Sequence, residues 1–228
     1  MAQTSKQVKD YVFCGDCEKT FNREGERWIH TLFASLGGPF PLRERLHKQA
    51  PISDMGDAKL YAAGNNPEID VPKLTHFGCG VFFKGAVHSW HGDPGKPYIE
   101  MDPDEIDALR QYLLGKADLP QTMALCVTVD SASVILQAMN EPCRAKPILG
   151  FTQYVFYVPG IFFQLCIGDS AQEKIHMCIN GSPDGLTLYE NVSISMRNTW
   201  REELKNAKPS QKLLDMMADL EKKGLGKL

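Results

Sequence analysis

The stretch TQYVFYVPGIFFQLCIGD, residues 152–169, carries the strongest indication of the fold class. It consists of two short runs that are rich in β-branched and aromatic residues, and Pro159 and Gly160 separate them. Such runs, bounded by turn residues, indicate strands, and the Pro-Gly pair predicts a hairpin between them. Aromatic side chains occupy both faces of each run, which predicts burial on both sides or one face offered to a partner. The C-terminal half is therefore expected to hold an antiparallel sheet.

Further runs of the same kind lie at 122–130 and 174–180 and are also predicted to be strands. Upstream of them the pattern is helical. Apolar residues recur near helical spacing in segments that predict helices over 18–36, 41–49, 70–90 and 102–115. The clearest of these starts with Asp102, Pro103 and Glu105, a set typical of a helix N-terminus with a capping box. Residues 51–70 are rich in turn formers and are predicted to be loop.

The expected fold class is therefore α+β. A helical region at 1–120 is followed by a region at 121–228 that holds the antiparallel sheet and amphipathic C-terminal helices from 197 onward. We expect the two regions to form one compact unit, because 228 residues are enough to bury a substantial core.

Composition excludes several classes of function. The net charge of −3 argues against a large nucleic-acid-binding surface, although it does not exclude a local basic patch. No apolar run reaches the roughly 18–20 residues of a membrane helix, and the N-terminus lacks the apolar centre of a signal peptide, so we expect a cytoplasmic protein without a membrane partner. The sequence contains neither a nucleotide-binding glycine loop nor a nucleophile elbow.

Cys14 and Cys17 form a C-x2-C pair, the commonest half-site for structural zinc. The pattern argues against a zinc finger, because no second histidine or cysteine follows His30 at the required spacing. His88 and His91, three residues apart near a predicted helix end, would complete a Cys2His2 set; the alternative is that both are surface residues. The remaining cysteines lie in apolar contexts and are expected to be core residues: Cys79, Cys126, Cys143, Cys166 and Cys178.

Three motifs in this order resemble a family of bacterial HNH-endonuclease-like proteins, several of which occur in anti-phage defence loci. They are YVFCGDCEKTFNREGE at 11–26, FGCGVFFKGAVHSW at 77–90 and LRQYLLG at 109–115. The resemblance covers roughly residues 5–130. It implies that Cys14 and Cys17 bind structural zinc, and it matches Glu18 and Glu26 without assigning them a role.

Members of this family carry a first C-x2-C pair and a histidine-bearing segment before the part that this chain matches. The histidine is the general base, and it helps to bind a catalytic divalent ion. No cysteine or histidine precedes Cys14, so we expect the catalytic half to be absent, omitted upstream or supplied by a partner. His30 is the only nearby base and the candidate catalytic residue. The resemblance thus implies a metal-dependent endonuclease of DNA or RNA; the alternative is a non-catalytic module that binds a protein partner of a defence complex.

Overall fold

The computed structural model describes residues 13–88, 97, 99–148, 151–171, 178–182 and 184–198. Contacts divide the chain into two units, 1–193 and 194–228, and the architecture below belongs to the first. No helix in these described ranges is both long and apolar enough to cross a membrane. The combination of helices with a largely antiparallel sheet confirms the predicted α+β class.

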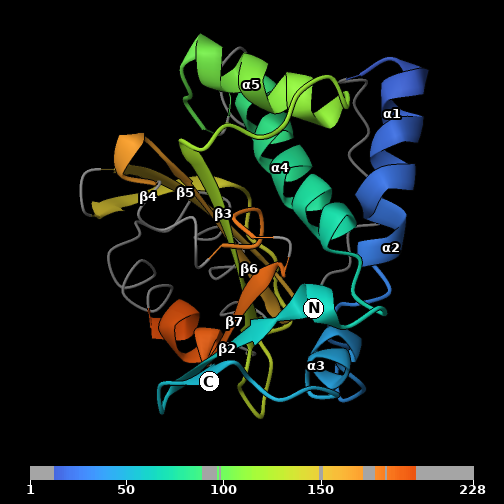
Figure 1. The fold of residues 1–228 in the computed structure, drawn as a ribbon, viewed down its shortest axis with the longest axis vertical. Coiled ribbons are helices and arrows are strands. Elements are labelled where there is room, and N and C mark those ends of the chain that lie inside the picture. The colour runs from blue at the N-terminus through green and yellow to red at the C-terminus, as the bar shows by residue number, and fades with distance from the viewer. Residues whose placement is uncertain are drawn as a thin grey trace, which may run out of the picture. The chain divides into compact units, whose positions relative to one another are not determined.

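A seven-stranded sheet runs through the molecule in the order β1-β2-β7-β3-β6-β5-β4 (Figure 1). Its strands are β1 (Ser53–Asp54), β2 (Ala58–Ala62), β3 (Met123–Asp130), β4 (Cys143–Ile148), β5 (Phe151–Val158), β6 (Ile161–Ile167) and β7 (Leu186–Glu190). Neighbouring strands are antiparallel except β3 and β7, which run parallel. The sheet is therefore mostly, but not wholly, of the predicted antiparallel kind.

The predicted hairpin between β5 and β6 is confirmed. Pro159 and Gly160 link β5 to β6, and Gly160 has a φ of 88°, a conformation that glycine adopts without strain. The register places Phe156 opposite Phe163, and their rings stack with centroids 4.6 Å apart. Both rings are buried, so this aromatic pair anchors the core face of the sheet.

The helices include those predicted at 41–49, 70–90 and 102–115. The observed elements are α1 (Gly15–Phe21), a π-helical turn (Asn22–Glu26), α2 (Arg27–Ile29), α3 (Pro41–Leu46), α4 (Val71–Val87), α5 (Pro103–Leu113) and 3-10 turns at Ala63–Asn65 and Asp169–Ala171. Asp70 caps α4 by accepting a hydrogen bond from the N–H of Lys73 at 3.0 Å. Helix α5 begins with the predicted capping box, in which Glu105 accepts from the N–H of Asp102 at 3.0 Å.

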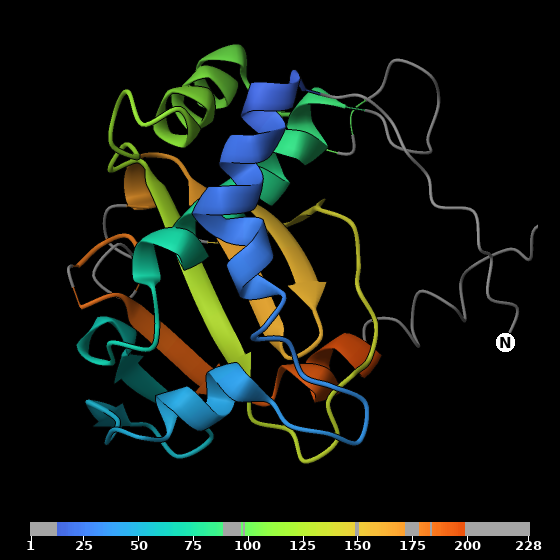
Figure 2. The same cartoon turned by 90° about the vertical axis from the view of Figure 1, so that its right-hand side faces the viewer.

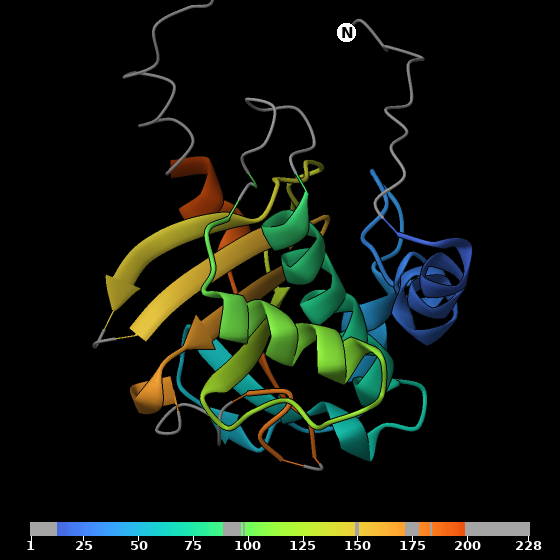
Figure 3. The ribbon, with the colours of Figure 1, turned by 90° about the horizontal axis from the view of Figure 1, so that it is seen from above.

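Helix α4 is the central layer, with the sheet on one side and α1 on the other (Figures 2 and 3). Two of its glycines permit this close packing. A Cβ at Gly78 would lie 2.9 Å from the Leu125 side chain and 3.0 Å from that of Phe163, both in the sheet. A Cβ at Gly80 would lie 3.1 Å from the Phe21 ring of α1. The sequence of α4 is therefore apolar almost all round because the helix is buried on opposite sides.

The helix predicted over 18–36 is shorter than expected. It starts at Gly15, passes through the π-helical turn and ends at Ile29. Leu36, expected on its apolar face, is 85% exposed. The chain leaves the helical path because the N–H of Ala34 bonds to the carbonyl of Pro159 at 2.9 Å, which ties this segment to the β5–β6 turn.

The loop predicted at 51–70 was wrong in part, because β1 and β2 lie within it. Strands β4 and β7 were also not predicted. The strand expected at 174–180 lies partly outside the described residues, and its described end, 178–180, is a turn. Residues 192–198 are helical, which agrees with a C-terminal helix; the rest of that predicted segment lies outside the described residues.

Candidate metal site

Cys14 and Cys17 meet at the start of α1. Cys14 occupies the N-cap position with extended backbone, and its carbonyl accepts the first helical hydrogen bond, from Glu18, at 3.1 Å. This turn brings the two Sγ atoms to 3.4 Å from each other. Two thiolates on a tetrahedral zinc ion, each about 2.3 Å from the metal, lie about 3.8 Å apart. A small rotation of one side chain is enough to reach that separation.

The surroundings favour loss of a proton from Cys14. The backbone N–H of Cys17 is the main cause that lowers the pKa of the exposed Cys14 thiol, and the hydrogen bond with the Cys17 thiol adds to it. The pKa of Cys17 is raised, first because its thiol shares that hydrogen bond with Cys14. Since the thiolate is the metal-binding form, Cys14 is more readily available as a ligand than Cys17.

Aromatic stacking fixes the cysteine pair to α4. The ring of Phe13 stacks on Phe21 at 5.1 Å and on Phe83 at 5.6 Å. The ammonium of Lys84 lies 4.9 Å from the Phe21 ring centroid and forms an ion pair with Glu26 of the π-helical turn. Residues on both sides of the cysteines are thus held by the C-terminal part of α4.

His88 follows α4 as its C-cap, and its backbone N–H bonds to the carbonyl of Lys84 at 3.2 Å. This places His88 one helical turn beyond Phe83 and Lys84, which contact the α1 segment. His91 lies outside the described residues. Among the residues that the structure describes, no three cysteine, histidine, aspartate or glutamate side chains form a group that could hold a metal ion. The predicted set of Cys14, Cys17, His88 and His91 therefore stays a prediction.

His30 lies at the far end of the same helical run. It lies thirteen positions after Cys17 in the sequence, which corresponds to roughly 20 Å along a helix. Its side chain is exposed and its ring meets Phe33 edge-on at 5.2 Å. The structure therefore does not bring His30, the sequence-based candidate for a catalytic base, to the cysteine pair.

A cavity of about 480 Å³ between α1, α4 and α5 contains a histidine that the sequence did not single out, His76. Its Nε2 lies 3.3 Å from the carbonyl oxygen of Leu113, and its Nδ1 is buried without a hydrogen-bond partner among the described residues. Burial is the main cause that lowers the pKa of His76, so the ring is neutral near pH 7 and donates from Nε2. Only the packing of three elements distant in sequence reveals this site.

Charged residues at the rim of this cavity are already paired. Arg23 and Glu24, both in the π-helical turn, form an ion pair at 2.5 Å. Lys73 forms one with Asp70 at 3.0 Å. These pairs neutralise the cations that line the cavity, which reduces its attraction for a phosphate group.

A second, smaller pocket adjoins Cys17. Its volume is about 190 Å³, and most of its lining is apolar. Phe13, Phe21, Phe83, Leu113 and Leu114 line it together with Thr20 and Arg110. Leu114 is 41% exposed. The cysteine pair thus lies beside a hollow large enough for one apolar side chain.

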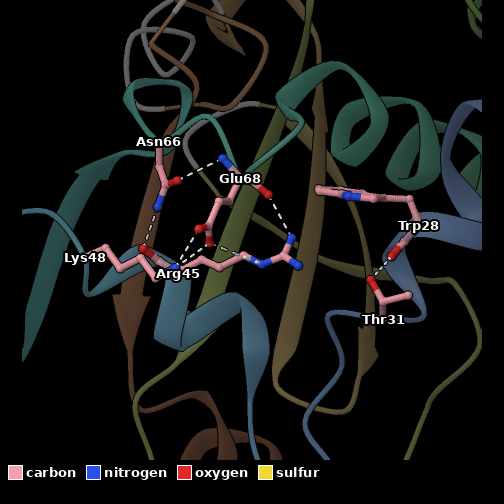
Figure 4. Close-up of polar contacts among 6 residues, drawn as sticks. All are labelled: Trp28, Thr31, Arg45, Lys48, Asn66 and Glu68. Atoms are coloured by element: carbon pink, nitrogen blue, oxygen red, sulfur yellow. Dashed lines mark hydrogen bonds and ion pairs between the residues drawn. The ribbon is translucent and has the colours of Figure 1, made fainter.

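Another polar cluster, between α3 and the segment before α4, has a structural role (Figure 4). Both carboxylate oxygens of Glu68 accept hydrogen bonds from Lys48 at 2.6 Å, and the Glu68 carbonyl accepts from Arg45 at 2.7 Å. Asn66 donates to the Arg45 carbonyl at 2.7 Å. Nearby, the Thr31 hydroxyl donates to the Trp28 carbonyl at 2.7 Å, where α2 ends. These contacts serve the fold and leave the cysteine pair as the candidate site.

Comparisons with protein-family models, with curated proteins and with solved structures found no match. The resemblance to HNH-endonuclease-like proteins therefore rests on the sequence motifs alone.

Proposed function

We propose that this protein is a zinc-organised binding or assembly module related to the HNH-endonuclease-like proteins, in which Cys14 and Cys17 supply two of the zinc ligands. The observation that carries the proposal is the 3.4 Å separation of their Sγ atoms on a turn fixed by aromatic stacking. A preformed pair of thiols loses little conformational freedom when it binds a metal. Binding requires thiolates, which the lowered pKa of Cys14 favours and the raised pKa of Cys17 opposes.

Two sources can complete the ligand set. His88 stands at the end of α4, whose preceding turn contacts the α1 segment, so His88 with His91 is the source within this chain. A partner protein that contributes its own C-x2-C pair is the other source. Both arrangements give four nitrogen or sulfur ligands, as structural zinc requires.

The apolar pocket beside Cys17 supports a role in assembly. A side chain inserted between Phe13 and Leu114 would bury apolar surface next to the metal. We propose that the partner is a protein that presents a leucine, phenylalanine or similar residue to this pocket. A protein component of a bacterial defence complex is the class that the motif resemblance implies.

Cobalt titration tests the metal part of the proposal. Co²⁺ replaces Zn²⁺ at tetrahedral thiolate sites and gives a sulfur-to-cobalt charge-transfer absorption. We expect this band in the wild-type protein and its loss in Cys14→Ser with Cys17→Ser. Cys143→Ser, which removes an exposed cysteine elsewhere, is the matched control and should keep the band. Light scattering with and without the metal then reports whether a second copy completes the site.

Cleavage of DNA or RNA with a divalent ion is the second proposed function. Its supporting observation is the cavity that holds Arg23, Lys73 and His76, because cations and an imidazole are the groups a phosphodiester needs. It ranks second because both cations are paired with carboxylates and because Nδ1 of His76 is buried. Incubation of the protein with DNA and with RNA in Mg²⁺ or Mn²⁺ decides: cleavage that His76→Gln abolishes would favour the nuclease, and intact substrate would favour the module.

A further inference from the structure

Two cysteines far apart in the sequence meet on the side of the sheet opposite α4. The Sγ atoms of Cys126, in β3, and Cys178 are 2.8 Å apart, although the residue numbers differ by 52. Cys178 is fully buried, and Cys126 is partly buried. These two sulfur atoms are closer together than those of Cys14 and Cys17, which are 3.4 Å apart. They also belong to distant segments of the chain, whereas Cys14 and Cys17 lie on one turn.

Backbone and side-chain hydrogen bonds hold the segment 178–182 against β3. The N–H of Ile179 donates to the carbonyl of Leu125 at 2.9 Å. The side chain of Asn180 accepts from the N–H of Leu125 at 2.8 Å and donates to the carbonyl of Met123 at 2.9 Å. These three bonds hold the two residues that follow Cys178 against the residues of β3 that precede Cys126. The meeting of the two sulfur atoms is therefore built into the fold.

The thiols lie in a small apolar cluster with Ala124, Phe151, Cys166 and Ala171. Cys166 is the only other cysteine of this cluster, and the register sets it opposite Ala124 rather than opposite Cys126. Cys126 faces Gln164 across the β3–β6 pair. Cys178 is thus the cysteine placed to react with Cys126.

We propose that Cys126 and Cys178 form a redox-modification site, a dithiol that a hydroperoxide oxidises to a disulfide. The thiol of Cys126, the more accessible of the two, loses its proton, and the thiolate attacks a peroxide oxygen. The O–O bond breaks, Cys126 becomes a sulfenic acid, and the expelled hydroxide or alkoxide takes up that proton and leaves as water or an alcohol. The Cys178 sulfur then attacks the Cys126 sulfur, the S–O bond breaks, and the hydroxide leaves as water with the Cys178 proton. The peroxide is reduced by two electrons, and two thiols become one disulfide.

The disulfide would covalently attach the segment 178–182 to β3 and close a ring of about 50 residues. Such a link restricts the unfolded chain far more than a disulfide between Cys14 and Cys17, which closes a ring of only a few residues. Oxidation should therefore raise the melting temperature of the protein by roughly 5–10 °C. Under oxidising conditions the disulfide would keep the segment 178–182 attached to β3, on the side of the sheet opposite α4.

Peptide mapping of the full chain tests this inference. The protein, first reduced, is treated with hydrogen peroxide while folded, alkylated and digested with trypsin. Cys126 lies in the peptide 117–144, together with Cys143, and Cys178 lies in 175–197. We expect these peptides to appear as one disulfide-linked species that dithiothreitol separates. The species should persist in Cys143→Ser, the matched control that shares the first peptide, and disappear in Cys126→Ser.

Three results would overturn the inference. One is wild-type protein whose two peptides stay unlinked after peroxide. Another is a linked species that survives in Cys126→Ser, because Cys143 would then be the partner. The third is linkage of 175–197 to the peptide that carries Cys166. If Cys126→Ser does not fold, the linked species in folded Cys143→Ser alone identifies Cys126, since no other cysteine remains in 117–144.

Discussion

At the scale of single residues, Gly25 sets how closely the N-terminal helix approaches α4. It lies in the π-helical turn, and a Cβ placed there would be 3.0 Å from both the Lys73 carbonyl oxygen and the Phe77 nitrogen. Both atoms belong to the backbone of α4 and cannot rotate away. Glycine is therefore required here by the helix–helix contact that positions the cysteine pair, not by a turn.

Gly25→Ala should lower the free energy of unfolding by about 1–3 kcal/mol, because the added methyl group forces the two helices apart. Gly15→Ala is the matched control in the same helical run. A Cβ at Gly15 meets nothing within 4 Å, so this change should be neutral or stabilising, as alanine favours the helix. Urea unfolding of both variants measures the difference; equal stabilities would show that α1 does not pack on α4 as described.

His76 makes stability depend on pH. Burial lowers its pKa in the folded protein below the value of about 6.5 expected in the unfolded chain, and Lys84 lowers it further, while the Leu113 carbonyl, Glu24 and Glu26 raise it. The unfolded state therefore binds a proton more readily. The contribution of His76 to stability is present above about pH 6.5 and is lost as the pH falls toward the lower, folded pKa.

His76→Gln should therefore reduce the difference in unfolding free energy between about pH 7.5 and about pH 5. His47→Gln should act in the same direction, since burial also lowers the pKa of His47, with the Arg43 and Lys59 charges adding to it. Urea unfolding at the two pH values provides the comparison. A His76→Gln variant with the wild-type difference would contradict the burial of this imidazole.

At the scale of elements, the N-terminus of α4 depends on one side chain. Asp70 accepts the N–H of Lys73, one of the backbone groups that the helix itself cannot satisfy. Asp70→Ala should lower the free energy of unfolding by about 1 kcal/mol. Asp70→Asn keeps an acceptor oxygen and should therefore retain most of the stabilisation that the cap provides. The surface ion pair with Lys73 adds little. Equal losses in the two variants, measured by urea unfolding, would assign the effect to charge instead of capping.

The elements that sequence patterns predicted are those with strong local signals. Helix α5 has its capping box, and the β5–β6 hairpin has Pro159 and Gly160 between two apolar runs. The end of the first helix could not be predicted, because a hydrogen bond from Ala34 to the distant Pro159 determines it. Local pattern carries no information about such a tertiary contact.

The missed strands lack a local signal for the same reason. Strand β2 is short, contains Lys59 and lies among turn formers, and its pairing with β7 is what makes it a strand. Strand β4 contains Pro147, which suits an edge strand and obscures the pattern. The parallel contact of β3 with β7 likewise follows from the order of strands in the sheet, which no short motif specifies.

At the scale of the whole molecule, the candidate site combines a local part with a part that only the fold provides. The C-x2-C spacing predicted that Cys14 and Cys17 would meet, and their sulfur atoms do meet. The stacking of Phe13 on Phe83, the pocket beside Cys17 and the cavity around His76 arise from helices far apart in sequence. His30 is the opposite case. It is near the cysteines in sequence, but it lies at the other end of the helical run that begins with them.

The most direct test of the account is the zinc content of the purified full chain, measured by elemental analysis. Wild-type protein is compared with Cys14→Ser plus Cys17→Ser, and Cys143→Ser is the control. We predict one zinc ion per chain if His88 and His91 complete the site, or one per two chains if a second copy does, and no zinc in the double variant. A double variant that keeps the zinc ion would contradict the claim that Cys14 and Cys17 are zinc ligands. Wild-type protein without zinc would contradict a site completed by this chain itself, whether by His88 and His91 or by a second copy.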